Sequence, residues 1–185
     1  MGLLDKVVAA VTPEASEEER AEAHARARGA SGGSGWLAMA LDHHELIEAA
    51  FANVQGAPSE SARRAAQKDL ALLLTGHSNA EEAVLYPAMA LSDQKAHSGA
   101  AYTEQSAAKV QLAALEDLDP TTGDYLDKLE HLRAAVMHHV HEEESEWFPK
   151  LKGSGDSNMQ SRLSRRFREE FERYMGGASP GTSPA

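Results

Sequence analysis

The 185-residue sequence contains no cysteine, and that absence excludes several kinds of site. Without thiols the chain can form no disulfide, cysteine nucleophile or thiolate metal site. Any bound metal must therefore be held by histidine and carboxylate side chains. The lack of cysteine also fits a reducing compartment, and we expect a cytoplasmic protein.

Positive charge and long apolar runs are scarce as well. The net charge of −11 argues against nucleic acid as a partner. No segment approaches the roughly 20 consecutive apolar residues that a membrane span needs. The N-terminus MGLLDK lacks the Ser or Thr of a myristoylation signal. These absences predict a soluble protein with neither a membrane nor a nucleic-acid partner.

The sequence does contain strong helical periodicity, and aromatic residues make up only 5% of it. Four long helical patterns, joined by short turns, cover roughly residues 36–55, 60–91, 94–118 and 124–151. Short connections place consecutive helices antiparallel. We therefore predict an all-α fold, an antiparallel up-down-up-down four-helix bundle with extra N- and C-terminal helices.

The predicted organisation has four parts. They are an N-terminal helical extension (1–30), the bundle (36–152), a C-terminal amphipathic helix (157–175) and a disordered tail (176–185). The C-terminal helix carries an apolar stripe of Leu163, Phe167, Phe171 and Tyr174, which predicts packing against the bundle. A subunit interface is the alternative, so the terminal helices either cover the bundle or build a homodimer.

One motif occurs twice, 62 positions apart. HSNAEEAVLYP begins at His77 and HVHEEESEWFP begins at His139. In each, a Glu follows the His by four residues (Glu81 and Glu143), and a Pro follows that Glu by six. Residues i and i+4 share one face of a helix, about 6 Å apart along its axis. Each motif therefore presents one nitrogen and one oxygen to the same point.

Both motifs lie on faces that are apolar at their ends and polar in their centres. An unpartnered charge buried there would be costly, and a shared cation would remove that cost. In the first long helix His43 occupies the middle of the apolar stripe, and we expect it to add a third imidazole. We expect His44 and His138 to lie at the rim of the site, and His24 to be a surface or packing residue.

These residues resemble a known family. LDHHEL, HSNAEEAVLYP and HHVHEEESEWFP are similar to the motifs of the hemerythrin-like, HHE cation-binding domain, over about residues 36–151. The resemblance implies an antiparallel four-helix bundle around a non-haem, usually dinuclear iron centre. Carried over residue by residue, it implies the metal ligands His43, His77, Glu81, His139 and Glu143.

The third long helix departs from the family pattern. The family supplies a His there, whereas this chain reads AYTEQSAAK, with Gln105 at the aligned position. Glu104 is the added candidate ligand, and Tyr102 and His97 are alternatives. This departure argues against a reversible oxygen carrier rich in His at one iron.

The resemblance implies two irons per chain, with zinc or manganese as alternatives. The site would bind or react with O2, peroxide or NO, or serve iron or oxygen sensing or storage. The competing hypothesis is a mononuclear Zn or Fe structural or sequestration module without redox chemistry. A peroxide- or NO-reactive enzyme is conceivable, but we favour a binding protein. The Glu-x-x-His motif of ferritin-like carboxylate sites does not occur here.

Overall fold

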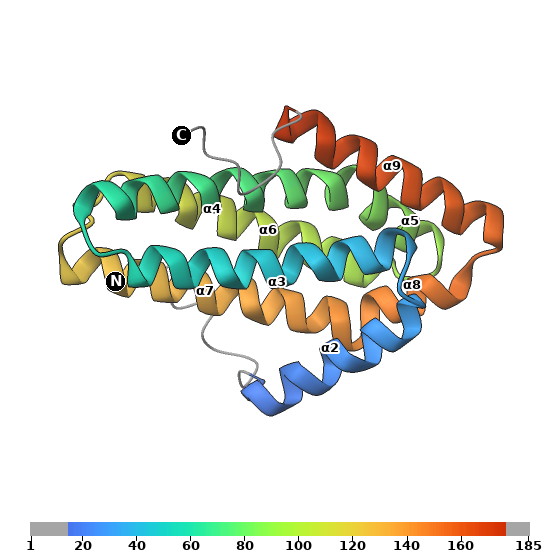
Figure 1. The fold of residues 1–185 in the computed structure, drawn as a ribbon. Helices are drawn as coiled ribbons and strands as arrows, with labels where there is room; N and C mark the ends of the chain where they lie inside the picture. The colour runs from blue at the N-terminus through green and yellow to red at the C-terminus, as the bar shows by residue number, and fades with distance from the viewer. Residues whose placement is uncertain (1–14, 177–185) are drawn as a thin grey trace.

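The computed structural model describes residues 15–176, and every regular element among them is helical. Antiparallel helical rods form the bundle, as Figure 1 shows. They begin with α3 (Gly35–Gly56), α4 (Glu60–Ala80), α6 (Lys95–Glu116) and α7 (Gly123–Glu142). Two further helices flank the bundle, α2 (Glu17–Ser31) and α9 (Ser157–Met175). The prediction of an all-α bundle with extra terminal helices is confirmed.

Two of the rods change their helical winding partway along. The α4 rod passes through a π-helical turn, η1 (Glu81–Leu85), into α5 (Tyr86–Leu91). The α7 rod passes through η2 (Glu143–Trp147) into α8 (Phe148–Ser154). Each π turn begins at the Glu of one repeated motif, and that motif's Pro lies in the first turn of the helix beyond. A Pro lacks the amide proton and crowds the carbonyl four residues back, so it disfavours the regular pattern there.

Side-chain caps fix where several helices begin. Ser59 accepts a hydrogen bond from the Ala62 amide at the start of α4. Thr122 does the same for the Tyr125 amide at the start of α7, and Asp156 caps α9. Such caps satisfy amides that a helix leaves unpaired at its N-terminus. The Ser59 and Thr122 caps thus mark the starts of the two rods that carry the repeated motifs.

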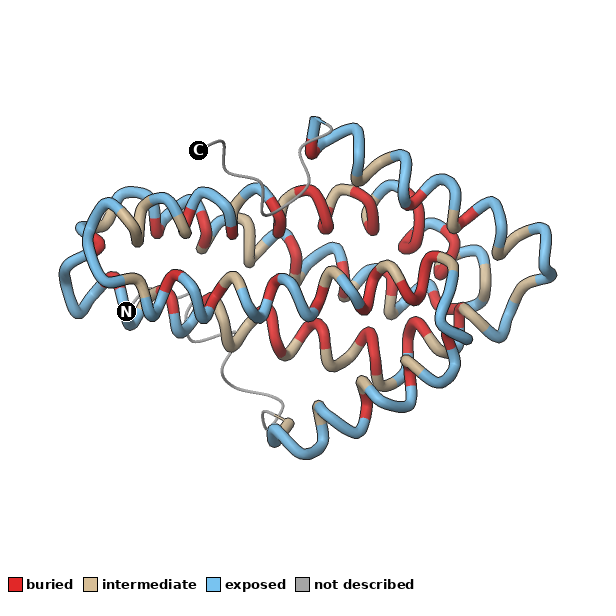
Figure 2. Tube along the Cα trace, viewed as in Figure 1, coloured by how far each residue is buried: buried red, intermediate tan, exposed pale blue. Residues whose placement is uncertain are grey.

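The buried side chains form two apolar clusters. One cluster, at the end of the bundle where α5 and α8 lie, includes Trp36, Tyr86 and Phe148. The other includes Phe51 and Tyr125. Figure 2 shows that buried positions recur along the inward sides of the rods. The buried His and Glu side chains of the repeated motifs belong to neither cluster.

The flanking helices pack on the bundle, and α9 lies against α3 and α4. Gly76 of α4 permits this contact, because a Cβ there would lie 3.2 Å from Met175 Sδ. Residues 1–14 of the expected N-terminal extension and nearly all of the tail expected over residues 176–185 fall outside the described residues. Among residues 15–176, no helix is both long and apolar enough to cross a membrane.

Candidate metal centre

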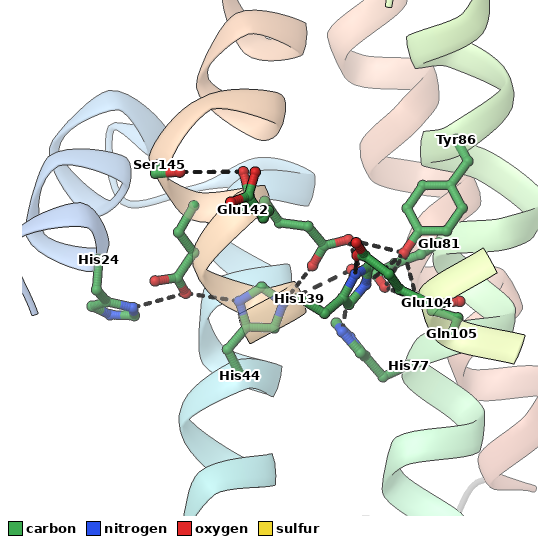
Figure 3. A network of polar contacts seen from close by, with 12 residues as sticks. His24, His44, His77, Glu81, Tyr86, Glu104, Gln105, His139, Glu142 and Ser145 are labelled. Carbon is green, nitrogen blue, oxygen red and sulfur yellow. Dashed lines mark hydrogen bonds and ion pairs between the residues drawn. The ribbon is translucent and has the colours of Figure 1, made fainter. Parts of the chain in front are cut away.

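Four side chains from three rods bring potential ligand atoms together inside the bundle. They are His44 of α3, His77 of α4, Glu81 at the start of η1 and Glu143 at the start of η2. One nitrogen or oxygen from each lies within 4.8 Å of the others, and all four residues are buried. Figure 3 shows the His44, His77 and Glu81 side chains converging. Two imidazoles and two carboxylates form a donor set suited to iron, manganese or zinc.

Several atoms of this group have no hydrogen-bond partner. They are His44 Nε2, Glu81 Oε1 and Glu143 Oε2. Glu81 Oε1 lies 3.2 Å from His77 Nε2, and Glu143 Oε2 lies 3.3 Å from His44 Nε2. Buried polar atoms that face one another without hydrogen bonds are costly, and a cation between them would remove the cost. The residues present therefore fit a bound metal ion.

The other oxygens of the two carboxylates face a second group of donors. The Tyr86 hydroxyl lies 3.1 Å from Glu81 Oε2 and 2.9 Å from Glu143 Oε1. It also lies 3.0 Å from His139 Nε2, and His139 Nε2 is 3.2 Å from Glu143 Oε1. Each carboxylate thus has one oxygen in each group.

The π turn brings Tyr86 into the site. Tyr86 follows Glu81 by five residues, and in a regular α-helix such residues point about 140° apart around the axis. In η1 the Tyr86 amide bonds the Glu81 carbonyl, which is the i→i+5 pattern of a π turn. The wider turn reduces the angular separation, so both side chains reach the interior. Periodicity alone did not reveal this residue, although the Pro that follows it in the sequence marks the disturbed turn.

The third rod places an amide beside the second donor group. Gln105 of α6 is buried, and its Nε2 lies 2.5 Å from both Glu81 Oε2 and the Tyr86 hydroxyl. Glu104, the candidate ligand on this helix, is part-exposed and accepts a hydrogen bond from His139 Nδ1 at 2.8 Å. That contact orients His139 with its Nε2 toward the cluster. Glu104 therefore contacts the candidate ligand His139 on the ring nitrogen that faces away from the cluster.

The other two candidates on this helix point elsewhere. The Tyr102 hydroxyl donates to the Glu82 carbonyl at 2.7 Å, and the ring is partly exposed. The His97 ring stacks on Trp147 with ring centroids 5.7 Å apart. Neither side chain is in the donor groups described above. Tyr86, from the α4 rod, contacts Glu81, Glu143 and His139 through its hydroxyl instead.

The structure corrects the placement of the two adjacent histidines. His43, expected on the inward face, stacks its ring on Phe171 of α9 with centroids 3.9 Å apart. His44, expected at the rim, has the nitrogen that faces Glu81 and Glu143. The α3 rod is rotated so that the second residue of the pair faces the bundle axis. Metal ligation by any of these residues stays a prediction.

The charges of the cluster depend on one another. Burial raises the pKa of Glu81, and the negative charge of Glu143 adds to it, giving about 7. Burial acts to lower the pKa of His139, but the charge of Glu143 and the hydrogen bond to Glu104 outweigh it and raise the value to about 10. Burial likewise opposes protonation of His44, whose pKa the surrounding carboxylates nevertheless raise. The raised pKa values favour protons on His44 and His139, which balance the carboxylates, whereas burial lowers the pKa of His77; a bound metal would displace such protons.

A small cavity of about 20 Å³ lies next to the cluster. Polar residues line one part of it, and apolar side chains that include Leu74 and Val136 line the rest; the polar residues are His77, Ser78, Glu104, Gln105 and His139. A space of this size accommodates a water-sized molecule. The arrangement can therefore hold a very small ligand between the candidate donors and an apolar wall.

Comparison with known proteins supports the family resemblance that the sequence motifs indicated. The family model of the hemerythrin HHE cation binding domain matches residues 37–151. A curated protein of Nostoc sp. (strain PCC 7120), named DNA nickase, is 29% identical over 111 residues. That match covers 58% of this chain and 32% of the Nostoc protein, so the chain spans about a third of that relative. No solved structure matches the chain significantly.

Proposed function

Because the chain belongs to the hemerythrin HHE cation-binding family, we propose that it holds a dinuclear non-haem iron centre that binds or reacts with O2, peroxide or NO. Sensing or storage of iron or oxygen would use the same centre. The metal-binding character rests on the family match and the buried His and Glu cluster. The proposal adds three points to this metal-binding character: the metal is iron, each chain holds two ions, and the ions bind a small molecule.

The observation that supports two ions is the division of the carboxylate oxygens. Glu81 and Glu143 each turn one oxygen toward His44 and His77 and the other toward Tyr86. The first ion would be held by His44, His77 and one oxygen of each carboxylate. The second would be held by His139, Tyr86 and the remaining oxygens. Iron in these positions would supply redox chemistry toward O2, peroxide or NO.

The chain's own residues would confine and orient the ligand. The cavity beside His77 and His139 is small enough to select diatomic or similarly small molecules. Gln105 lines it, and the Gln105 side-chain oxygen has no hydrogen-bond partner. The two apolar clusters of the bundle keep bulk water away from the donors. Polar interactions are stronger in such a water-poor site.

One observation favours the alternative of a single zinc or iron ion. The α6 residue that contacts Glu81 is Gln105, and an amide is a weaker metal ligand than His or carboxylate. The second ion would then depend on Tyr86. If Tyr86 remains protonated, the first group alone would hold one ion, in a structural or sequestration role.

DNA nicking is not part of the proposal. The Nostoc protein bears that name, but the match covers only 32% of its length. The net charge of this chain is −11, which disfavours binding to a polyanion.

Elemental analysis of the purified protein, with an ultraviolet-visible spectrum of the same sample, tests the proposal. We expect about two irons per chain and near-ultraviolet charge-transfer bands. Addition of NO or peroxide should change those bands. One zinc per chain without such bands would contradict the redox site and support the single-ion alternative. Absence of metal after reconstitution with Fe(II) would contradict both.

A further inference from the structure

The flanking helix α2 reaches the candidate metal centre through a hydrogen-bonded chain of side chains. His24 Nδ1 of α2 lies 3.0 Å from Glu144 Oε1, and the same oxygen lies 2.7 Å from His44 Nδ1. Figure 3 shows the line of contacts from His24 to His44. Helix α2 precedes residues 37–151, the segment that matches the family model. His24 was expected to be only a surface or packing residue.

Glu144 determines which nitrogen of His44 faces the cluster. Its carboxylate is 4% exposed and lies against Nδ1. The opposite nitrogen, His44 Nε2, then points toward Glu143 and Glu81 and has no hydrogen-bond partner. A metal-bound histidine commonly donates its other ring N–H to a carboxylate, which fixes the ring orientation and the tautomer. Glu144 is placed to do this for His44.

His24 in turn holds Glu144. A carboxylate with one partner can rotate about its side-chain bonds, whereas a second partner fixes its position. The other ring nitrogen, His24 Nε2, lies 3.0 Å from Glu45 Oε1 on α3. The His24 ring therefore connects the carboxylate behind His44 to the helix that carries His44.

The docking of α2 depends on such polar contacts. The residues that it buries are small, namely Ala23, Ala27 and Ser31. Small side chains allow close approach but add little apolar area. Arg28 of α2 contacts Asp42 and Glu45 of α3, each at 2.6 Å. Polar contacts therefore align the helix with the metal centre.

We propose that Glu144 and His24 are positioning residues that hold His44 for metal binding. Through His24, helix α2 then contributes to the metal affinity of the centre. This inference rests on the proposed function, since it assigns a role toward the same site. It also implies reciprocity, because a helix that favours the metal-binding orientation of His44 is itself favoured when metal is bound.

Fe(II) affinity, measured by chelator competition on the full chain, tests the inference. Glu144→Gln should weaken Fe(II) binding by about 10–100-fold, the range typical for partners of metal-bound histidines. His24→Ala should weaken it by about tenfold, at the lower end of that range. In the Glu144→Gln background, His24→Ala should have no further effect, because His24 acts through Glu144.

Two comparison variants distinguish a positioning role of His24 from a role of α2 that is limited to covering the site. Arg26→Ala changes an exposed residue of α2 that pairs with Glu22 within the helix, and it should bind Fe(II) like the wild type. His24→Asn keeps a donor near Glu144 and should restore most of the affinity lost in His24→Ala. Thermal melts of the metal-free variants verify that each is folded.

The outcomes distinguish the two proposals. If the wild type and Arg26→Ala bind Fe(II) and His24→Ala binds it equally well, the inference fails and the proposed function stands. An equal effect of His24→Ala in both backgrounds would also overturn the inference, since His24 would then act independently of Glu144. If the wild type binds no Fe(II), both proposals fail.

Discussion

His43 and His44 are neighbours in the chain with identical side chains, yet their surroundings differ. His43 stacks on Phe171 and Phe167, and burial lowers its pKa to about 4. His44 is buried among carboxylates, which raise its pKa against the effect of burial. A ring between apolar partners favours the neutral form, and a ring among carboxylates favours either a proton or a metal ion.

Replacement of the two histidines should therefore have unequal effects. His44→Ala removes a candidate ligand and should weaken Fe(II) binding by more than about 100-fold, beyond the range for indirect partners. His43→Ala should retain the metal content of the wild type, because its ring faces α9. Elemental analysis after dialysis measures both. Loss of metal in His43→Ala with retention in His44→Ala would reverse the assignment.

The protonation of the Tyr86 hydroxyl also depends on the groups that surround it. Its hydroxyl contacts both carboxylates and His139, and burial raises its pKa, with the charges of Glu143 and Glu81 adding to the effect. A metal ion reverses this tendency, because a bound cation stabilises the phenolate. Tyr86 would then be a ligand of the second ion.

We expect the iron-loaded protein to show a visible phenolate-to-iron charge-transfer band that Tyr86→Phe abolishes. The ring and its packing are retained in this variant, so the fold should persist. Tyr102→Phe is the matched control, since the Tyr102 hydroxyl bonds the Glu82 carbonyl outside the cluster. A visible spectrum recorded under the same loading conditions provides the measurement. Persistence of the band in Tyr86→Phe would exclude phenolate ligation.

At the scale of elements, the π turns and the flanking helices shape the site. Both π turns begin at a candidate metal ligand, Glu81 in η1 and Glu143 in η2. π turns are rare and occur frequently at functional sites. Helix α9 covers the outer side of the site by placing Phe167 and Phe171 against His43.

The anchoring of α9 depends on Phe167, which is fully buried. Phe167→Ala should lower the free energy of unfolding by about 3–5 kcal/mol, as expected for truncation of a buried Phe. Arg165→Ala, on the exposed face of the same helix, should change it by less than about 0.5 kcal/mol. Urea unfolding of the metal-free proteins measures both values. Equal stability of the two variants would mean that α9 contributes little to the fold.

At the scale of the whole molecule, the site couples stability to pH. In the unfolded chain the histidine pKa is about 6.5, whereas in the folded protein that of His139 is raised to about 10. The folded state therefore retains a proton that the unfolded state releases. This stabilisation is fully present below about pH 6.5 and is lost as the pH rises through about 10. Glu81, raised from 4.5 to about 7, changes stability in the same direction at lower pH.

The metal-free protein should accordingly melt at a lower temperature at pH 9.5 than at pH 6.5. Thermal melts of chelator-treated protein across this range test the expectation. His139→Gln cannot carry the extra proton, so its melting temperature should depend less on pH. A wild-type melting temperature that stays constant or rises between these pH values would contradict the charge arrangement.

The sequence by itself determined the bundle and the level of the site within it. Helical periodicity and short turns predicted rods over 60–91 and 124–151, and the structure has continuous rods from 60 to 91 and from 123 to 154. The i, i+4 spacing predicted that Glu81 would lie beside His77 and Glu143 beside His139, and the structure shows both pairs. These features are local, since they depend on the geometry of a single helix.

Only the tertiary structure decided which further residues meet at that level. The choice between His43 and His44 depends on the rotation of α3, which is set by packing on α4, α7 and α9. The approach of Tyr86 depends on a π turn, which shifts the side chains beyond it around the axis. The contact of His24 with Glu144 joins residues 120 positions apart. Such contacts arise from the docking of separate helices, and periodicity within one helix carries no information about them.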